Sequence, residues 1–166
     1  MVSKKPVKTL DDLKGLKVRS SGKIADMLKT VGVSPVLVPG EEIYTALSTG
    51  VIDAAHWGAA AGALTTKLCE PAKYYVQPNL AFSATDLVMV SKKAWDELPA
   101  DIQKMVYLAF KERCWRRSNE YIQEETKALD TMKKNFGVQV SLLDAEAQKA
   151  MQQAAMKMLY STTLSR

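Results

Sequence analysis

One arginine stands where the chain could grip a carboxylate. Arg19 ends a short apolar segment, 16–19, that predicts a strand, and a Ser20–Gly22 turn and a helix follow it. Ligands of open α/β sheets bind at the carboxyl ends of parallel strands. A guanidinium binds a carboxylate through paired hydrogen bonds, and the N–H groups of a turn at Ser20 and Ser21 would add further donors. A surface arginine paired with an acid would fit the same position, so the residues alone leave both interpretations open.

A second pair of polar or aromatic side chains, His56 and Trp57, follows another apolar segment, 51–55. An aromatic wall with a few polar groups is typical of small-ligand pockets. The alternative is equally consistent with the pattern: Trp57 would then be a core residue, and His56 a satisfied or exposed histidine.

The sequence contains no spacing or motif that is typical of a catalytic site or of a metal site. His56 is the only histidine, and Cys69 and Cys114 form no metal-ligand spacing. No phosphate-binding loop, dinucleotide fingerprint or nucleophile elbow occurs. We therefore expect no enzyme activity, no metal and no cofactor. The two cysteines are expected to be reduced thiols, with a disulfide only in an exported chain.

Composition narrows the class of protein. The chain has 166 residues, 47% hydrophobic and 25% charged, with a net charge of +5, as in an ordinary globular protein of one to one and a half domains. The one dense basic cluster, 111–117, is surrounded by acids, which argues against nucleic-acid binding. No apolar run reaches the ~18 residues of a membrane span. The first residues lack the apolar stretch of a signal peptide, so the chain as written is expected in the cytoplasm.

The elements that must position these side chains alternate along the chain. Residues 1–8 are expected to be a flexible lead-in, with Thr9 capping a first helical turn. Residues 16–55 then predict strand, helix, strand, helix and strand, with the apolar strands of a parallel sheet. Segments 74–76 and 86–90 predict further strands. From Pro99 to Phe136 no Pro or Gly interrupts the helical pattern, so one helix would run for roughly 50 Å. A strand at 137–140 and a helix capped by Asp144 follow.

Several motifs occur together and in a fixed order. They are Asp11-Asp-Leu-Lys-Gly-Leu-Lys-Val-Arg19, Glu42-Ile-Tyr-Thr-Ala-Leu-Ser-Thr-Gly-Val-Ile-Asp53, Ala72-Lys-Tyr-Tyr75 and Trp95-Asp-Glu-Leu-Pro99-Ala-Asp-Ile-Gln103. Together they resemble the C-terminal half of the periplasmic solute-binding proteins of tripartite ATP-independent periplasmic (TRAP) transporters, the DctP-like family. The His56-Trp57 and Lys73-Tyr-Tyr75 features are most similar to the branch that binds 2-oxo acids and related carboxylates.

The resemblance implies a fold and a set of binding residues. The fold would be α/β, the second lobe of a type II periplasmic-binding-protein-like fold, with a mixed, mostly parallel sheet flanked by helices. The implied domains are an α/β solute-binding lobe at 9–84, a crossing strand, long brace helix and return strand at 85–140, and a C-terminal helix at 141–166. Arg19 would grip the ligand carboxylate, and Phe82 and Asp86 fall on the next pocket loop and strand. The family's acidic metal ligand is missing from loop 78–85, and His56 replaces the Glu of its Glu-Trp pair.

The resemblance also bears on partners and location. Family members act in the periplasm, and membrane permease subunits would be partners only of a full-length form. In the complete fold the long helix reaches the other lobe, so here Ile102, Val106 and Phe110 are expected to form an exposed apolar face. Such a face favours a homodimer or larger oligomer, with exchange of the long helix or the 86–91 strand. Two functions stay open: a module that binds a small organic carboxylate, and a repurposed structural protein whose oligomer surface matters.

Overall fold

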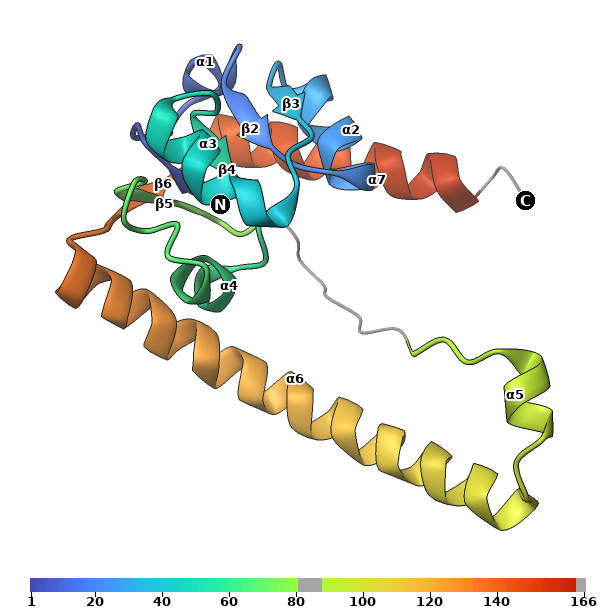
Figure 1. Ribbon diagram of the computed structural model, residues 1–166. Coiled ribbons are helices and arrows are strands. Elements are labelled where there is room, and N and C mark those ends of the chain that lie inside the picture. Colours follow the sequence, from blue (N-terminus) through green and yellow to red (C-terminus); the bar gives the residue numbers. More distant parts are fainter. Residues whose placement is uncertain (81–87, 164–166) are drawn as a thin grey trace.

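The computed structural model describes residues 1–80 and 88–163, and its centre is one mixed β-sheet (Figure 1). The sheet has six strands in the order β3-β2-β4-β1-β5-β6. They are β1 (Val2–Ser3), β2 (Lys17–Arg19), β3 (Ser34–Val36), β4 (Ala54–Ala55), β5 (Tyr74–Gln77) and β6 (Gln139–Leu142). The pairs β2–β3, β2–β4 and β5–β6 are parallel, whereas β1 runs antiparallel to both of its neighbours. The sheet is therefore mixed and mostly parallel, as expected.

Helices cover the sheet on both faces. The helices of the described part of the chain are α1 (Leu10–Leu13), α2 (Gly22–Thr30), α3 (Ile43–Thr49) after the 3-10 turn η1 (Gly40–Glu42), α4 (Ala60–Thr65), α5 (Lys92–Asp96), α6 (Ala100–Phe136) and α7 (Ala145–Thr163). Side chains of α1, α2 and α7 form one buried cluster around Val18 and Val76. Side chains of α3, α4 and the end of α6 form a second cluster around Ala55 and Tyr75. Each face of the sheet thus has its own core.

The flexible lead-in expected at residues 1–8 is wrong. Val2 and Ser3 form β1, which lies between β4 and β5 in the middle of the sheet and is fully buried. Further along, the backbone N–H and C=O of Val7 both bond to the buried hydroxyl of Ser141. A two-residue strand among lysines shows no periodicity, and its pairing depends on segments more than 50 residues away. This segment is therefore part of the core.

Both helix caps expected from the sequence are present. Thr9 accepts a hydrogen bond from the Asp12 N–H, and Asp12 bonds back to the Thr9 N–H, which completes a capping box. Asp144 caps α7 by accepting from the Ala147 N–H at 2.8 Å. The strand expected at 86–90 falls partly outside the described residues, and its described part, 88–90, is not a strand.

The long helix is confirmed as one unbroken α6 of 37 residues, which ends at Gly137 in a left-handed conformation (φ 66°). Its C-terminal part packs on the sheet through Ala128 and Met132, with α4 beside it. Its N-terminal part extends away from the sheet and carries α5 at its far end (Figure 1). Ile102 and Phe110 are exposed there as expected, whereas Val106 is half-buried.

Candidate ligand-binding site

Arg19 lies at the carboxyl end of β2, where three parallel strands end together. Its Nε donates to the Val38 carbonyl oxygen at 3.1 Å, and its Nη1 donates to the His56 carbonyl oxygen at 3.1 Å. These two carbonyls follow β3 and β4, the strands on either side of β2. Neighbouring strand ends thus hold the guanidinium from both sides, because a parallel sheet brings its carboxyl ends to one edge.

Arg19 has no acidic partner in the described part of the chain. Within residues 1–80 and 88–163, no Asp or Glu forms an ion pair with Arg19. The side chain is half-buried, and burial lowers the pKa of its guanidinium from its usual value. A guanidinium has five N–H donors and stays charged at neutral pH. The two carbonyl oxygens use only some of these donors, so the guanidinium can still bind an anion through two hydrogen bonds.

Trp57 forms the wall beside this arginine. The guanidinium carbon of Arg19 lies 4.6 Å from the centroid of the Trp57 ring, a cation–π distance. The ring is pressed against Gly40, where an added Cβ would lie only 2.7 Å from its Cη2 atom. The indole therefore packs partly on the core, as Val36 and Leu64 do, and also contacts Arg19. The two alternatives for Trp57, core residue and site wall, are thus combined in one side chain.

His56 contributes its backbone to this corner and a neutral ring. Its N–H donates to the Arg19 carbonyl oxygen at 2.9 Å, and its own carbonyl accepts from Arg19. Burial, and then the positive charges of the chain's amino terminus and of Arg19, lower the pKa of His56 to about 4. At neutral pH the imidazole is uncharged, so Arg19 is the cation of this corner.

The two serines after Arg19 have different environments. The Ser20 N–H donates to the Val36 carbonyl oxygen at 3.2 Å and so belongs to the sheet. The Ser20 hydroxyl is buried without a hydrogen-bond partner among the described residues. Strand alternation places it on the face of Val18, opposite Arg19. Ser21 is exposed at the N-cap of α2 without a capping side-chain bond. The Ser20 N–H is therefore already engaged within the sheet.

Two other sequence-predicted site residues, Phe82 and Asp86, lie outside the described residues. A residue that sequence reasoning missed is Glu125 on α6. It is half-buried and accepts the N–H groups of Ala60 and Ala61 at the start of α4. No local signal could identify it, because the contact joins segments 65 residues apart.

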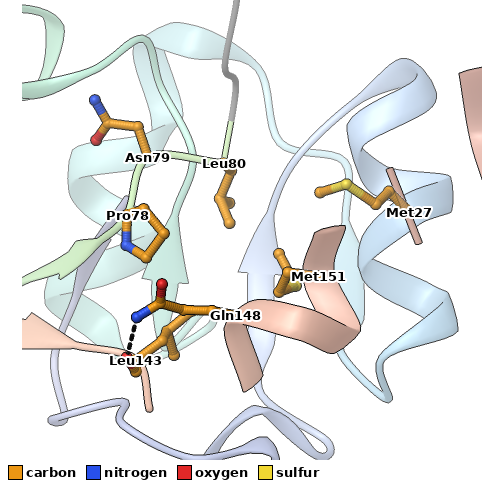
Figure 2. Close-up of a pocket in the computed structure, with 7 residues that line it drawn as sticks. All are labelled: Met27, Pro78, Asn79, Leu80, Leu143, Gln148 and Met151. Atoms are coloured by element: carbon orange, nitrogen blue, oxygen red, sulfur yellow. Dashed lines mark hydrogen bonds between the residues drawn. The ribbon is translucent and has the colours of Figure 1, made fainter. Parts of the chain in front are cut away.

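A pocket elsewhere in the chain has a different character from the surroundings of Arg19 (Figure 2). It lies between α2, α7 and the segment after β5, and is lined by Met27, Pro78, Asn79, Leu80, Leu143, Gln148 and Met151. None of these residues is charged, and the two amides are engaged: Gln148 donates to the Leu143 carbonyl oxygen and Asn79 accepts from Tyr75. This pocket is therefore unsuited to an anion, in contrast to the corner at Arg19.

The described residues contain neither a metal-binding cluster nor a helix that could cross a membrane. No group of three or more His, Cys, Asp or Glu side chains is placed to hold a metal ion within 1–80 and 88–163. Over that same part of the chain, no helix combines the length and the apolarity needed to cross a membrane.

Comparisons with known proteins identify the family of the chain. The family model of the bacterial extracellular solute-binding proteins, family 7 (DctP), matches residues 1–165. The chain is 35% identical over 119 residues to the monocarboxylate 2-oxoacid-binding periplasmic protein of Nostoc sp., covering 71% of this chain and 33% of that protein. It is 30% identical over 152 residues to the C4-dicarboxylate-binding periplasmic protein DctP of Rhodobacter capsulatus, covering 90% of this chain and 45% of that protein.

A solved structure matches over the whole chain. A TRAP periplasmic solute-binding protein from Colwellia psychrerythraea, with bound calcium and pyruvate, superposes with a TM-score of 0.81 at 26% identity. The match covers 99% of this chain and 51% of that one. The chain therefore spans between a third and about a half of the length of these relatives, which are solute-binding proteins and not enzymes. By family model, sequence and fold alike, this chain belongs to family 7 of the bacterial extracellular solute-binding proteins, the DctP family of TRAP transporters.

Proposed function

We propose that the chain is a carboxylate-binding lobe in which Arg19 anchors the solute. The observation that carries this proposal is the state of Arg19: two backbone carbonyls and an indole orient it, and no acid within the described residues neutralises it. A guanidinium that is already oriented, has no acidic partner among the described residues and lies at the end of a strand is suited to binding a planar anion. Trp57 and the Ser21 N–H would contact the rest of a small solute, together with Phe82 and Asp86.

The relatives narrow the class of solute. The Nostoc protein is named for monocarboxylate 2-oxo acids, the Rhodobacter protein for C4-dicarboxylates, and the Colwellia protein holds pyruvate. Their shared group is a carboxylate on a short carbon chain. We infer a 2-oxo acid as the solute, the periplasm as the place of action, and TRAP permease subunits as partners of the complete receptor. The cytoplasmic location expected from the first residues has no support among these periplasmic relatives.

Isothermal titration of the purified chain tests the anchor. The panel is pyruvate, a branched 2-oxo acid, lactate and a C4-dicarboxylate, each run against the native chain and Arg19→Ala. The expected result is binding of at least one acid to the native chain, with loss in Arg19→Ala. A matched control is Arg113→Ala, which removes an exposed arginine paired with Glu120. Binding that survives Arg19→Ala, or no binding of any acid, contradicts the proposal.

A second candidate function rests on the exposed apolar surface of α6. Large apolar side chains that are at least half exposed occur along 105–122, namely Met105, Tyr107, Leu108, Trp115 and Ile122. Monomeric soluble proteins rarely expose large contiguous apolar patches. We infer self-association through this helix, as a homodimer or a larger assembly, in which the oligomer surface rather than solute binding would matter.

Sedimentation velocity distinguishes a self-associated chain from a monomer. The native chain is expected to sediment as a dimer or larger, and the double variant Leu108→Glu/Trp115→Glu as a monomer. A monomeric native chain contradicts self-association. It leaves the carboxylate proposal unaffected, because Arg19 lies at the carboxyl end of β2 and not on the exposed part of α6.

A further inference from the structure

The start of α4 is capped by a side chain from a different part of the chain. Glu125, on α6, accepts the Ala60 N–H at 2.7 Å through Oε2 and the Ala61 N–H at 2.9 Å through Oε1. The first N–H groups of a helix have no partner within the helix, and a carboxylate is the favoured acceptor there. Ala59, at the N-cap, offers no side-chain bond. The anchoring of α4 therefore depends on α6.

The position of α4 in turn determines that of Trp57. Only Gly58 and Ala59 separate Trp57 from α4, and Gly58 has a left-handed φ of 59°. Inside α4, a Cβ added at Gly62 would lie 2.8 Å from the Trp57 carbonyl oxygen. The helix thus packs directly on the Trp57 backbone. A shift of the first turn of α4 would move the peptide that carries the indole.

The indole then contacts the proposed anchor. Trp57 packs against Gly40 and also contacts Arg19, with the guanidinium carbon 4.6 Å from its ring centroid. A continuous series of contacts therefore runs from Glu125 through α4 and Trp57 to Arg19. The part of α6 that carries Glu125 is itself fixed, because Ala128 and Met132 are buried in the same core.

We propose that Glu125 is a positioning residue for the Arg19–Trp57 site: from the long helix, its carboxylate sets the place of Trp57 and so the orientation of the guanidinium. The effect on solute affinity rests on the proposed function, whereas the effect on Trp57 does not. The neighbouring residue, Glu124, offers a matched control, since it pairs with Arg117 at 2.7 Å and its side chain is about half exposed.

The experiment isolates Trp57 as a fluorescent reporter. The chain has three tryptophans, so Trp95→Phe and Trp115→Phe leave Trp57 as the only indole. In this background we compare acrylamide quenching for the parent, Glu125→Gln, Glu125→Ala and Glu124→Gln. Met151→Ala serves as a stability control, because Met151 is buried in the core on the other face of the sheet. Pyruvate titrations of the same variants follow.

The expected result is more quenching of Trp57 in both Glu125 variants, with Glu125→Gln intermediate because it keeps one acceptor. Pyruvate affinity should fall about tenfold in Glu125→Ala, while Glu124→Gln matches the parent and Met151→Ala lowers only the Tm. If the Glu125 variants lower the Tm but leave Trp57 quenching at the parent level, Glu125 merely stabilises the fold and the proposal is overturned. If Glu125→Ala does not fold, the quenching of Trp57 in Glu125→Gln decides between a positioning role and a merely structural one. A parent that binds no pyruvate refutes the proposed function alone, since quenching needs no solute.

Discussion

The Arg19 guanidinium carbon lies 4.6 Å from the centre of the Trp57 ring, and both residues come from the carboxyl ends of adjacent parallel strands. The pairing of Arg19 with Ala55 in the β2–β4 register places the segment after β4 beside the guanidinium. The cation–π contact and the hydrogen bonds to two backbone carbonyls then fix the orientation of the Arg19 guanidinium.

The contact between Gly40 and Trp57 predicts that Gly40→Ala disturbs the site. A Cβ at Gly40 would lie 2.7 Å from the ring, so the indole must move. The expected loss of stability is about 1–3 kcal/mol, the usual cost of overpacking, with weaker pyruvate binding. Chemical unfolding and calorimetry measure the two effects.

A double-mutant cycle supplies the control for Gly40→Ala. Phe lacks the outer ring atoms of the indole, so Gly40→Ala should cost clearly less in a Trp57→Phe background. Equal costs in the two backgrounds would show that Gly40 acts through the backbone and not through Trp57.

Two buried serines are expected to respond oppositely to alanine. The Ser20 hydroxyl has no partner among the described residues, so Ser20→Ala should be neutral or stabilising by up to about 1 kcal/mol. The Ser141 hydroxyl accepts from the Val7 N–H at 2.8 Å and donates to the Val7 carbonyl at 2.7 Å. Ser141→Ala should therefore cost about 1–3 kcal/mol. Similar losses in urea unfolding for both variants would refute this distinction.

The state of His56 predicts how stability depends on pH. Burial lowers its pKa from 6.5 to about 4, so between these values the unfolded chain binds the proton and the folded chain does not. The contribution is complete above pH 6.5 and is lost as the pH falls towards 4, by an amount on the order of 2–3 kcal/mol.

Nuclear magnetic resonance can follow this titration directly, because His56 is the only histidine. The imidazole signal should titrate well below pH 6 in the folded chain. His56→Asn should show a shallower loss of stability over the same range. A folded-state pKa near 6.5 would contradict the buried, neutral ring.

The position of β1 predicts that an acid is not tolerated in the second residue. Val2 is 1% exposed between β4 and β5, so Val2→Asp would bury an unpaired charge and unfold the chain or destabilise it by several kcal/mol. Lys5→Asp introduces the same side chain at an exposed position nearby and should leave the Tm nearly unchanged. Equal melting temperatures for the two variants would restore the idea of a loose lead-in.

Local signals in the sequence predicted most elements of the fold. Thr9 and Asp144 mark helix starts because capping is decided within four residues, and Gly137 ends α6 because it adopts a left-handed φ. β1 was missed because its strand character depends on pairing with β4 and β5, neither of which is near it in sequence.

The site was predictable to the same extent. Arg19 and Trp57 could be placed together because the carboxyl ends of parallel strands share one edge. The contacts of Gly40 with Trp57 and of Glu125 with α4 are long-range packing, and no motif marks either residue. Sequence thus indicated the two side chains of the candidate site, Arg19 and Trp57, but not the residues that hold them in place.

The most direct test of the anchor compares two ligands of similar shape, one with a carboxylate and one with a neutral amide in its place. Pyruvate and its neutral amide, pyruvamide, are titrated calorimetrically into the native chain under the same conditions. If Arg19 grips a carboxylate, pyruvate should bind at least about tenfold more tightly, because a hydrogen bond to a charged group contributes about 1.5–3 kcal/mol. Equal affinities, or no heat from either ligand, would contradict a carboxylate site at Arg19.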